Sequence, residues 1–281
     1  DEEKAREFMK GLTPPYVLKA DGLAAGKGVL IIDDLDEAMS ELAQMFSGKF
    51  GDAGNTVVIE QFLKGIEASC FVLTDGKDYL LLPEAKDYKR IGEGDKGLNT
   101  GGMGAVSPVP FYTDEFRSKV EERIVKPTIR GLAEIGAKYC GFIFIGLMNC
   151  GGDPYVIEYN VRMGDPETEA VMTRIDSDFL GHLVAAAKGE LASEKMVYSP
   201  KTALTCVQVS GGYPEGYAKG YEICGLDDVK EAIVFHAGTS VKDGKVVTSG
   251  GRVLAITALG ETIPATREKL FAQVAKVTYT D

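Results

Sequence analysis

The chain of 281 residues has no tryptophan, only two histidines and a deficit of basic residues, with 31 Lys and Arg against 42 Asp and Glu. Its formal net charge of −11 argues against broad nucleic-acid binding, which needs a basic surface. No apolar run is long enough to span a bilayer, and no basic-then-apolar leader opens the sequence. We therefore predict a cytoplasmic protein without nucleic-acid or membrane partners, in which a local basic pocket for small phosphate ligands is still allowed.

The five cysteines are scattered without paired spacing, which predicts buried free thiols and no zinc site. The two histidines, His182 and His236, lie in a helical and a strand pattern. We interpret both as packed structural residues rather than as proton-transfer groups. A hydrophobic content of 44% provides a core for one large domain or two to three smaller ones.

Helical and strand patterns alternate along the chain, as is typical of an α+β protein. Residues 86–104 are polar and glycine-rich and predict a long loop, which is usually functional. From residue 201 onward, short strands and turns predict a separate carboxy-terminal lobe. The expected helices are 2–10, 35–46, 113–135, 178–189 and 264–276, and the expected strands are 16–19, 29–32, 57–62, 68–73, 79–83, 141–148 and 155–160.

The segment 156–167 places polar side chains at the end of an expected strand. Alternation puts Glu158, Asn160 and Arg162 on one face, and the apolar residues between them on the other, toward an apolar layer. A carboxylate and an amide oxygen two residues apart suit Mg²⁺, which takes few protein ligands and completes its octahedron with phosphate and water oxygens. The alternative is a solvated edge strand, which shows the same alternation.

Two lysines and three glycines follow the first strand, in the segment 19–29 (KADGLAAGKGV). Glycines let backbone N–H groups converge on an anion, and Lys19 adds a point charge, so the segment predicts a phosphate clasp around Gly26, Lys27 and Gly28. A Walker-type P-loop is excluded, because three residues rather than four separate Gly22 from Gly26 and a strand follows. A simple turn is the alternative.

The segment 59–69 reads as a strand end, a turn and a second strand. Backbone groups of Gln61, Phe62 and Leu63 could hydrogen-bond an adenine edge, with Phe62 and Leu63 as an apolar wall and Glu67 as the acceptor of ribose hydroxyls. A plain strand-turn-strand is the default interpretation when the segment is taken alone.

Four motifs in this order resemble the phosphoribosylamine–glycine ligase (glycinamide ribonucleotide synthetase) family of ATP-grasp enzymes. They are residues 19–29, 87–90 (DYKR), 99–105 (NTGGMGA) and 158–167 (EYNVRMGDPE), with tail motifs at 210–214, 235–239 and 249–253. The resemblance covers nearly the whole chain. It implies an α+β ATP-grasp fold, in which two α+β lobes close on Mg-ATP, followed by a carboxy-terminal β-rich lobe.

On this resemblance we expect a linker remnant at 1–13, a lid subdomain at 14–63, a core subdomain at 64–192 and the carboxy-terminal lobe at 193–281. The family's amino-terminal βαβ domain is not represented before Asp1. The helix at 2–10 runs almost directly into the strand at 16–19, where we expect a further strand and helix. We therefore also expect a segment to be missing near Lys10.

The implied reaction is the phosphorylation of the glycine carboxylate by ATP to glycyl phosphate, followed by attack of the amine of 5-phosphoribosylamine. The resemblance assigns Mg²⁺, or Mn²⁺, to Glu158 and Asn160, and adenosine to Glu60, Leu63 and Glu67. Lys19 and the loop that includes Gly26, Lys27 and Gly28 would contact the phosphates. Charge neutralisation and in-line positioning supply most of the catalysis in such a transfer.

We assign Arg162 and Asp165, together with Lys19, to the reacting groups, because the transferring phosphoryl and the glycine zwitterion require a cation and an anion. No general base is apparent. Further substrate contacts are expected at Lys89, Arg90, Asn99, Thr100, Gly101, Gly102, Met103 and Arg252. For Lys89 and Arg90 a solvated charge run is the alternative.

Two other functions are considered. The first is an ATP-grasp ligase for another carboxylate, such as bicarbonate, which would release ADP with bicarbonate and not with glycine. The second is a nucleotide-binding fragment that binds Mg-ATP without turnover. The sequence does not specify the oligomeric state, and a monomer is compatible with it.

Overall fold

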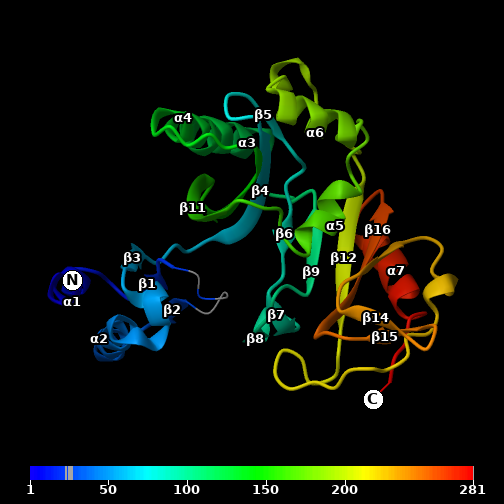
Figure 1. Cartoon of the computed structure of the whole chain (residues 1–281), viewed down its shortest axis with the longest axis horizontal. Helices are drawn as coiled ribbons and strands as arrows, with labels where there is room; N and C mark the ends of the chain where they lie inside the picture. Colours follow the sequence, from blue (N-terminus) through cyan, green and yellow to red (C-terminus); the bar gives the residue numbers. More distant parts are fainter. Residues whose placement is uncertain (23, 25–27, 281) are drawn as a thin grey trace. The chain divides into compact units, whose positions relative to one another are not determined.

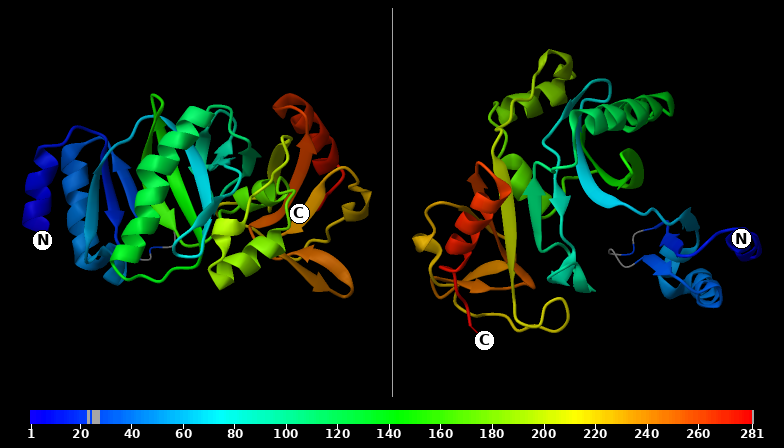
Figure 2. Two further views of the ribbon diagram at one scale, coloured as in Figure 1. Left: turned by 90° about the horizontal axis from the view of Figure 1, so that it is seen from above. Right: turned by 180° about the vertical axis from the view of Figure 1, so that it is seen from behind.

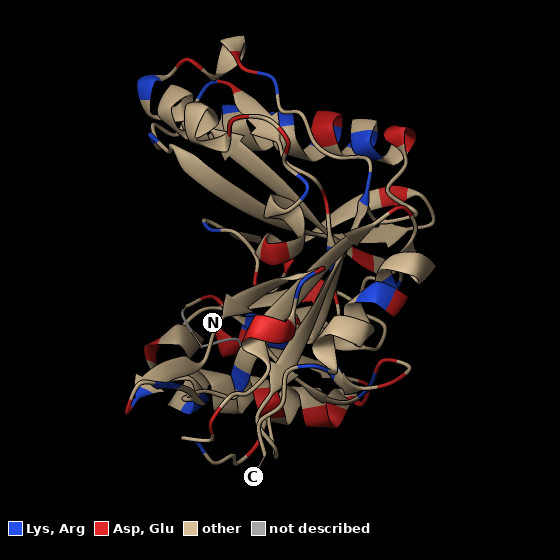
Figure 3. Cartoon of the chain, turned by 90° about the vertical axis from the view of Figure 1, so that its right-hand side faces the viewer, with Lys and Arg blue, Asp and Glu red and all other residues tan. Residues whose placement is uncertain are grey.

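The computed structural model of the chain describes residues 1–22, 24 and 28–280. It forms two compact units, Asp1–Lys64 and Gly65–Asp281, called here the N-terminal and the C-terminal unit (Figure 1). Figure 3 marks the acidic and basic residues along the ribbon, and both kinds occur in each unit. Within the described residues, no helix is both long enough and apolar enough to cross a membrane.

The N-terminal unit is an antiparallel sheet of order β2-β1-β3 with helices against one face (Figures 1 and 2). Met9, Leu18 and Leu42 are fully buried in the same hydrophobic core, so the first helix packs into the unit rather than lying outside it. The Asp34 side chain caps the second helix by accepting from the backbone N–H of Glu37 at 2.8 Å. The elements are α1 Glu2–Lys10, β1 Tyr16–Ala20, β2 Val29–Ile32, α2 Leu35–Gln44 and β3 Val57–Gln61.

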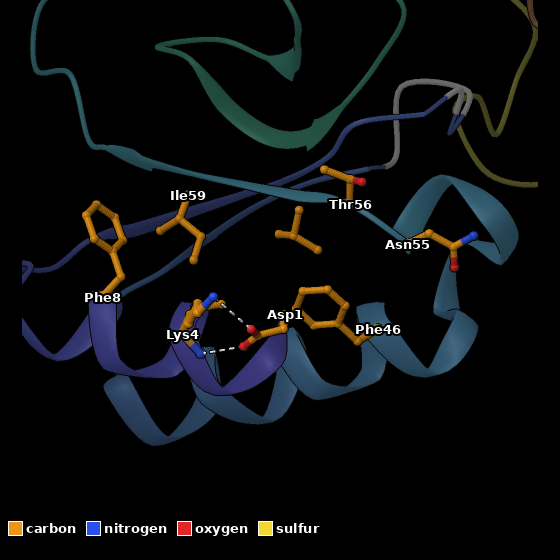
Figure 4. A pocket seen from close by; sticks show the side chains of 9 residues that line it. Asp1, Lys4, Phe8, Phe46, Asn55, Thr56 and Ile59 are labelled. Atoms are coloured by element: carbon orange, nitrogen blue, oxygen red, sulfur yellow. Dashed lines mark hydrogen bonds and ion pairs between the residues drawn. The ribbon is translucent and has the colours of Figure 1, made fainter.

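A cavity of about 360 Å³ lies within this unit, between α1 and β3 (Figure 4). Phe8, Phe46 and Ile59 provide its apolar lining, and Lys4 pairs with Asp1 at 3.5 Å beside it. None of the predicted site residues is among those that line it.

The C-terminal unit begins with an antiparallel sheet of order β11-β10-β4-β5. The central strand β4 is covered on both faces, because Val72 packs against the core beneath α3 and α4 while Phe71 and Leu73 pack toward α6. This double burial explains why the strand reads as a nearly continuous apolar run. The elements are β4 Ile66–Thr74, β5 Tyr79–Leu81, α3 Asp114–Val120, α4 Lys126–Glu134, β10 Gly141–Cys150, β11 Asp153–Asn160 and α6 Phe179–Lys188, with a π-helical turn Glu121–Val125 joining α3 to α4.

The C-terminal unit also contains a second sheet of order β13-β16-β12-β9-β6 and a separate two-stranded sheet of β14 and β15. Strand β12 pairs with β9 in the register Thr205↔Ala105, so residues from both sides of the expected 192/193 boundary share one sheet. That boundary stays a prediction. The elements are β6 Lys86–Asp87, β9 Gly104–Ser107, α5 Glu167–Met172, β12 Thr202–Val209, β13 Ile233–His236, β14 Thr239–Lys242, β15 Lys245–Thr248, β16 Arg252–Gly260 and α7 Ile263–Val274.

The expected long loop at 86–104 is wrong in part, because it contains β6 and the hairpin of β7 Arg90–Gly92 and β8 Lys96–Asn99. The hairpin residues are exposed, so no apolar alternation marks the two strands. All five cysteines are free, as predicted, but Cys140 and Cys224 are exposed rather than buried.

Candidate functional site

One face of the N-terminal sheet is open and apolar. Val29, Ile31 and Val58 are 47%, 59% and 38% exposed, while the opposite face packs on the helices. Lys19 pairs in register with Val29 and Val58 and therefore lies among them on the open face. Its Nζ is 2.6 Å from the Glu60 carboxylate. Exposed apolar side chains around one ion pair are typical of a ligand-binding face.

The loop after β1 is closed at its base by a backbone hydrogen bond from Ala20 N–H to Gly28 O at 2.8 Å. A Cβ at Gly28 would lie 2.7 Å from the Ala24 methyl carbon, so the close approach requires glycine here. Gly26 and Lys27, both predicted to contact phosphates, lie outside the described residues.

The predicted adenosine residues fall in both units. Gln61 ends β3, and Phe62 is 36% exposed while Leu63 is half-buried, in the N-terminal unit. Glu67 lies in β4 of the C-terminal unit, where its carboxylate accepts from Lys89 Nζ at 2.8 Å. The predicted acceptor of ribose hydroxyls is therefore already paired with a cation.

The predicted metal residues lie side by side at the end of β11. The Asn160 amide donates to Glu158 Oε1 at 3.1 Å, and Arg162 donates to Asn160 Oδ1 at 3.4 Å. On the opposite face, the Tyr159 hydroxyl lies 3.0 Å from Thr128 Oγ1 of α4. The expected apolar layer is wrong for Tyr159 and Val161, which are 48% and 73% exposed. Val161 lies beyond the strand, which ends at Asn160.

The donor set of this strand end fits a hard cation. One carboxylate and one amide oxygen suit an ion such as Mg²⁺ that takes its other ligands from phosphate and water. Among the residues that the structure describes, no group of three or more His, Cys, Asp and Glu could hold a metal by itself. Glu158 and Asn160 therefore fit a metal that is shared with a bound phosphate.

Lys89 is the centre of an acidic cluster in the C-terminal unit. Its Nζ lies 2.8 Å from Glu67 and 3.8 Å from Asp87. Burial acts to lower the pKa of Lys89, but Asp87, Glu67 and Glu158 together raise it above its ordinary value. Burial raises the pKa of Asp87, and Lys89 partly opposes that shift. The lysine is therefore held as a cation where carboxylates converge.

The buried carboxyl of Glu167 adjoins this cluster, and sequence reasoning did not select it as a site residue. It is 3% exposed and accepts a hydrogen bond from Ser69 Oγ at 2.9 Å. Burial and then the charge of Asp87 raise the pKa of Glu167 to about 7, against the opposing effects of Ser69 and Lys89. Its position directly after Gly164, Asp165 and Pro166, at the first turn of α5, was the available signal.

The expected substrate residues 89–103 separate into two groups. Arg90 donates to Gly97 O at 2.9 Å within the exposed hairpin, whose register pairs Arg90 with Asn99. Thr100 Oγ1 donates to Lys89 O at 2.8 Å, and Met103 N–H donates to Tyr88 O at 2.7 Å. The segment 100–103 is therefore tied to Tyr88 and Lys89, which lie between β6 and β7, while Arg90 belongs to the hairpin.

Arg252 is brought against two other predicted residues. Its guanidinium donates to both carboxylate oxygens of Asp165, at 3.1 and 2.7 Å, and to Gly101 O at 2.7 Å. Gly102, whose φ is +115°, would place a Cβ only 2.4 Å from Pro166 Cδ. Residues 101–102, 165–166 and 252 thus meet at one place.

Comparison with known proteins identifies the fold. The family described as "Phosphoribosylglycinamide synthetase, ATP-grasp (A) domain" matches residues 1–168, and the corresponding C domain matches residues 203–281. These matches define the class as an ATP-grasp domain joined to a C domain, which confirms the predicted α+β ATP-grasp fold. The chain belongs to the phosphoribosylglycinamide synthetase family.

Among curated relatives, phosphoribosylamine–glycine ligase of Rhizobium meliloti is 47% identical over 280 residues, covering 99% of this chain and 66% of that protein. The chloroplastic phosphoribosylamine–glycine ligase of Arabidopsis thaliana is 45% identical and is covered over 54% of its length. The chain thus spans less than two thirds of these relatives. The alignment with the Rhizobium protein runs over 280 residues, no more than the 281 of this chain, so it leaves no room for a further strand and helix, and the expected missing segment near Lys10 is wrong.

Solved structures agree. The crystal structure of phosphoribosylamine–glycine ligase from Thermotoga maritima superposes with a TM-score of 0.90 at 39% identity, covering 99% of this chain and 70% of that one. The biotin carboxylase domain of Hydrogenobacter thermophilus 2-oxoglutarate carboxylase gives a TM-score of 0.73 at 17% identity, covering 100% of this chain and 60% of that one, a likeness of fold alone.

Proposed function

We propose that the chain carries the nucleotide-binding and glycine-activating parts of a phosphoribosylamine–glycine ligase. ATP phosphorylates the glycine carboxylate, and the amine of 5-phosphoribosylamine displaces phosphate from glycyl phosphate to give glycinamide ribonucleotide, in purine biosynthesis. The observation that carries the proposal is the end of β11, where Glu158, Asn160 and Arg162 are linked in succession by hydrogen bonds. The names of the relatives at 47% and 45% identity support the choice of substrates.

Glu158 and Asn160 would hold Mg²⁺, with Mn²⁺ as the alternative ion. Mg²⁺, when bound, neutralises phosphate oxygens and lowers the cost of bringing a carboxylate against them. Arg162, exposed beside Asn160, supplies a fixed cation that can accompany the transferring phosphoryl group. Lys19 supplies a point charge for phosphate on the open face of the N-terminal sheet. Gly26, Lys27 and Gly28, which follow β1 in the sequence, are assigned to the phosphates as well. Residues 60–63 and Glu67 are assigned to adenosine.

Glycine and 5-phosphoribosylamine are assigned to the C-terminal unit. Asp165 is 61% exposed at its side chain and carries the negative charge that a glycine ammonium requires. Lys89, Arg90 and residues 99–103 are assigned to contacts with the acceptor and with glycine. The boundaries 1–13, 14–63, 64–192 and 193–281 are kept as the proposed subdomains.

The test separates glycine activation from transfer to the acceptor. Hydroxylamine attacks an acyl phosphate to give a hydroxamate and phosphate, so glycyl phosphate can be trapped without 5-phosphoribosylamine. We expect glycine hydroxamate and ADP to form in equal amounts with Mg-ATP, and no product when glycine is replaced by bicarbonate. Glu158→Ala should abolish formation of both, since one metal ligand is lost.

Glu222→Ala is the matched acidic control, because Glu222 pairs only with Lys245 among the interactions described, at 2.6 Å in the C-terminal unit. It should retain wild-type turnover. ADP release with bicarbonate but not with glycine would show that the chain is an ATP-grasp ligase for bicarbonate instead. Mg-ATP binding in calorimetry without any hydroxamate would reduce this chain to a nucleotide-binding fragment.

A further inference from the structure

Arg252 and Asp165 form a two-pronged ion pair, although 87 residues separate them in the sequence. Nη2 lies 2.7 Å from Oδ2 and Nη1 lies 3.1 Å from Oδ1, which is the parallel geometry that a guanidinium and a carboxylate prefer. The Arg252 side chain is 23% exposed, whereas Asp165 is 61% exposed. The arginine is therefore largely enclosed, while the carboxylate that it orients remains open to solvent.

The same guanidinium also holds the backbone of Gly101. Nη1 donates to Gly101 O at 2.7 Å, and a Cβ built on Gly101 would lie 3.1 Å from the guanidinium carbon. The glycine thus lies against the guanidinium, and a side chain at this position would press on it. On its other side, Gly101 N–H donates to the Tyr213 hydroxyl at 3.0 Å.

Arg252 and Tyr213 are themselves fixed by two glycine-rich segments of the C domain. Tyr213 covers Gly251, where a Cβ would lie 2.4 Å from Tyr213 Cδ2. Ser210 ties the segments together, because its N–H donates to Gly251 O and its hydroxyl donates to Gly250 O, both at 2.8 Å. Residues 210–213 and 250–252 are therefore held together by hydrogen bonds and close packing.

Four hydrogen bonds from Arg252 go to Gly101 and Asp165. Three of the five N–H groups of the guanidinium, both on Nη1 and one on Nη2, are therefore engaged by Gly101 and Asp165 rather than by a substrate anion. Glu169 adds a reason for the arrangement: burial raises the pKa of Glu169, Asp165 raises it further, and Arg252 opposes both. Without the arginine, the effect of Asp165 on the pKa of Glu169 would lose this opposing charge.

We infer that Arg252 is a positioning residue, which orients Asp165 and the Gly101–Gly102 backbone for the glycine ammonium and does not itself bind substrate. The inference rests on the proposed function, because it takes glycine as the ligand of Asp165. It makes the C domain a determinant of amino-acid recognition through residues 210–213 and 250–252.

The experiment uses Arg252→Lys, Arg252→Ala, Asp165→Asn and the Arg252→Ala/Asp165→Asn double variant of the full chain. Arg252→Lys keeps the positive charge but loses the paired N–H groups that bond both oxygens of Asp165. In the hydroxamate assay we expect Arg252→Lys to raise the glycine KM about tenfold, as for the loss of a charge-assisted hydrogen bond, with the Mg-ATP KM within about twofold of wild type. The double variant should be no worse for glycine than Asp165→Asn alone.

Hydrogen exchange provides a second measurement that does not depend on turnover. We expect amides of residues 99–103 to exchange faster in both Arg252 variants, with α6 unchanged. Arg123→Lys is the matched control, since Arg123 makes an ion pair with Asp153 at 2.8 Å and is assigned no part in the site. It should match wild type in both measurements. Thermal unfolding identifies any variant that fails to fold, and Arg252→Lys then carries the test.

An unchanged glycine KM in Arg252→Ala would overturn the inference, as would additive losses in the double variant, which would make Arg252 a direct ligand. If wild type forms no hydroxamate, the proposed function has failed. In that case hydrogen exchange alone tests the positioning role of Arg252. Faster exchange of the amides of residues 99–103 in the Arg252 variants supports this role, and unchanged exchange overturns it.

Discussion

The open sheet face of the N-terminal unit and the charged cluster of the C-terminal unit differ in how they hold their candidate functional residues. On the sheet face, exposed valine and isoleucine side chains surround one ion pair, Lys19–Glu60. In the cluster, Lys89 lies among several carboxylates and Glu167 is buried beside them. The apolar face of the sheet suits a ligand that is recognised through the apolar surface it covers. The cluster, in contrast, determines which of its side chains are protonated.

The strongest test of this contrast is Glu167→Gln, which removes a titrating group from the cluster but keeps an acceptor for Ser69. The pKa of Glu167 is raised from 4.5 to about 7 by burial and by Asp87, so its contribution to stability is present below pH 4.5 and is lost as pH rises through 7. The variant should therefore equal wild type near pH 4.5 and exceed it at pH 8 by on the order of 3 kcal/mol.

Urea unfolding at both pH values measures this difference. Glu115→Gln is the control, because the Glu115 side chain is 81% exposed on α3 and the change should leave the pH dependence unaltered. If the unfolding free energies of wild type and Glu167→Gln change with pH in parallel, then ionising Glu167 does not destabilise the fold. The contrast between the charged cluster and the sheet face would then be lost.

Lys19→Met tests the Lys19–Glu60 ion pair of the sheet face. A cation that contacts phosphate contributes to binding of the nucleotide but not of the nucleoside, so Mg-ATP affinity should fall about tenfold to a hundredfold, or roughly 1.4 to 2.8 kcal/mol. Adenosine affinity should not change. Calorimetric titration with both ligands decides this, and Lys49→Met, at the ion pair with Glu41, is the control from the same unit. Equal weakening of both ligands would indicate a general disruption of the sheet face.

Val29→Ser should produce the smallest effect. Val29 is 47% exposed, so unfolding free energy should change by less than about 0.5 kcal/mol. If its methyl groups are covered by a ligand, adenosine and ATP should both bind about threefold more weakly, since each buried methylene contributes about 0.8 kcal/mol. Val241→Ser, at a site 75% exposed on β14, should alter neither property. A loss confined to ATP would contradict an apolar contact.

Local patterns predicted most helices and strands, because apolar spacing reports which face of an element is buried. They did not predict the hairpin at 90–99, whose side chains are exposed. The motif at 158–167 predicted the neighbours Glu158, Asn160 and Arg162, since one strand brings them together. It could not predict the links from Glu167 to Ser69 or from Asp165 to Arg252, because 98 and 87 residues separate the partners and only the sheet topology joins them.

The pairing of β9 with β12 has a consequence for the newly made chain. Ala105 meets its partner Thr205 only after roughly 100 further residues have been synthesised. Until then β9 has an unpaired edge, because β12 has not been synthesised. The neighbouring residues Asp87, Lys89 and 99–103 then lack the sheet that holds them in place. A ribosome-bound chain that stops before residue 202 would therefore carry every one of these residues and still have no assembled site.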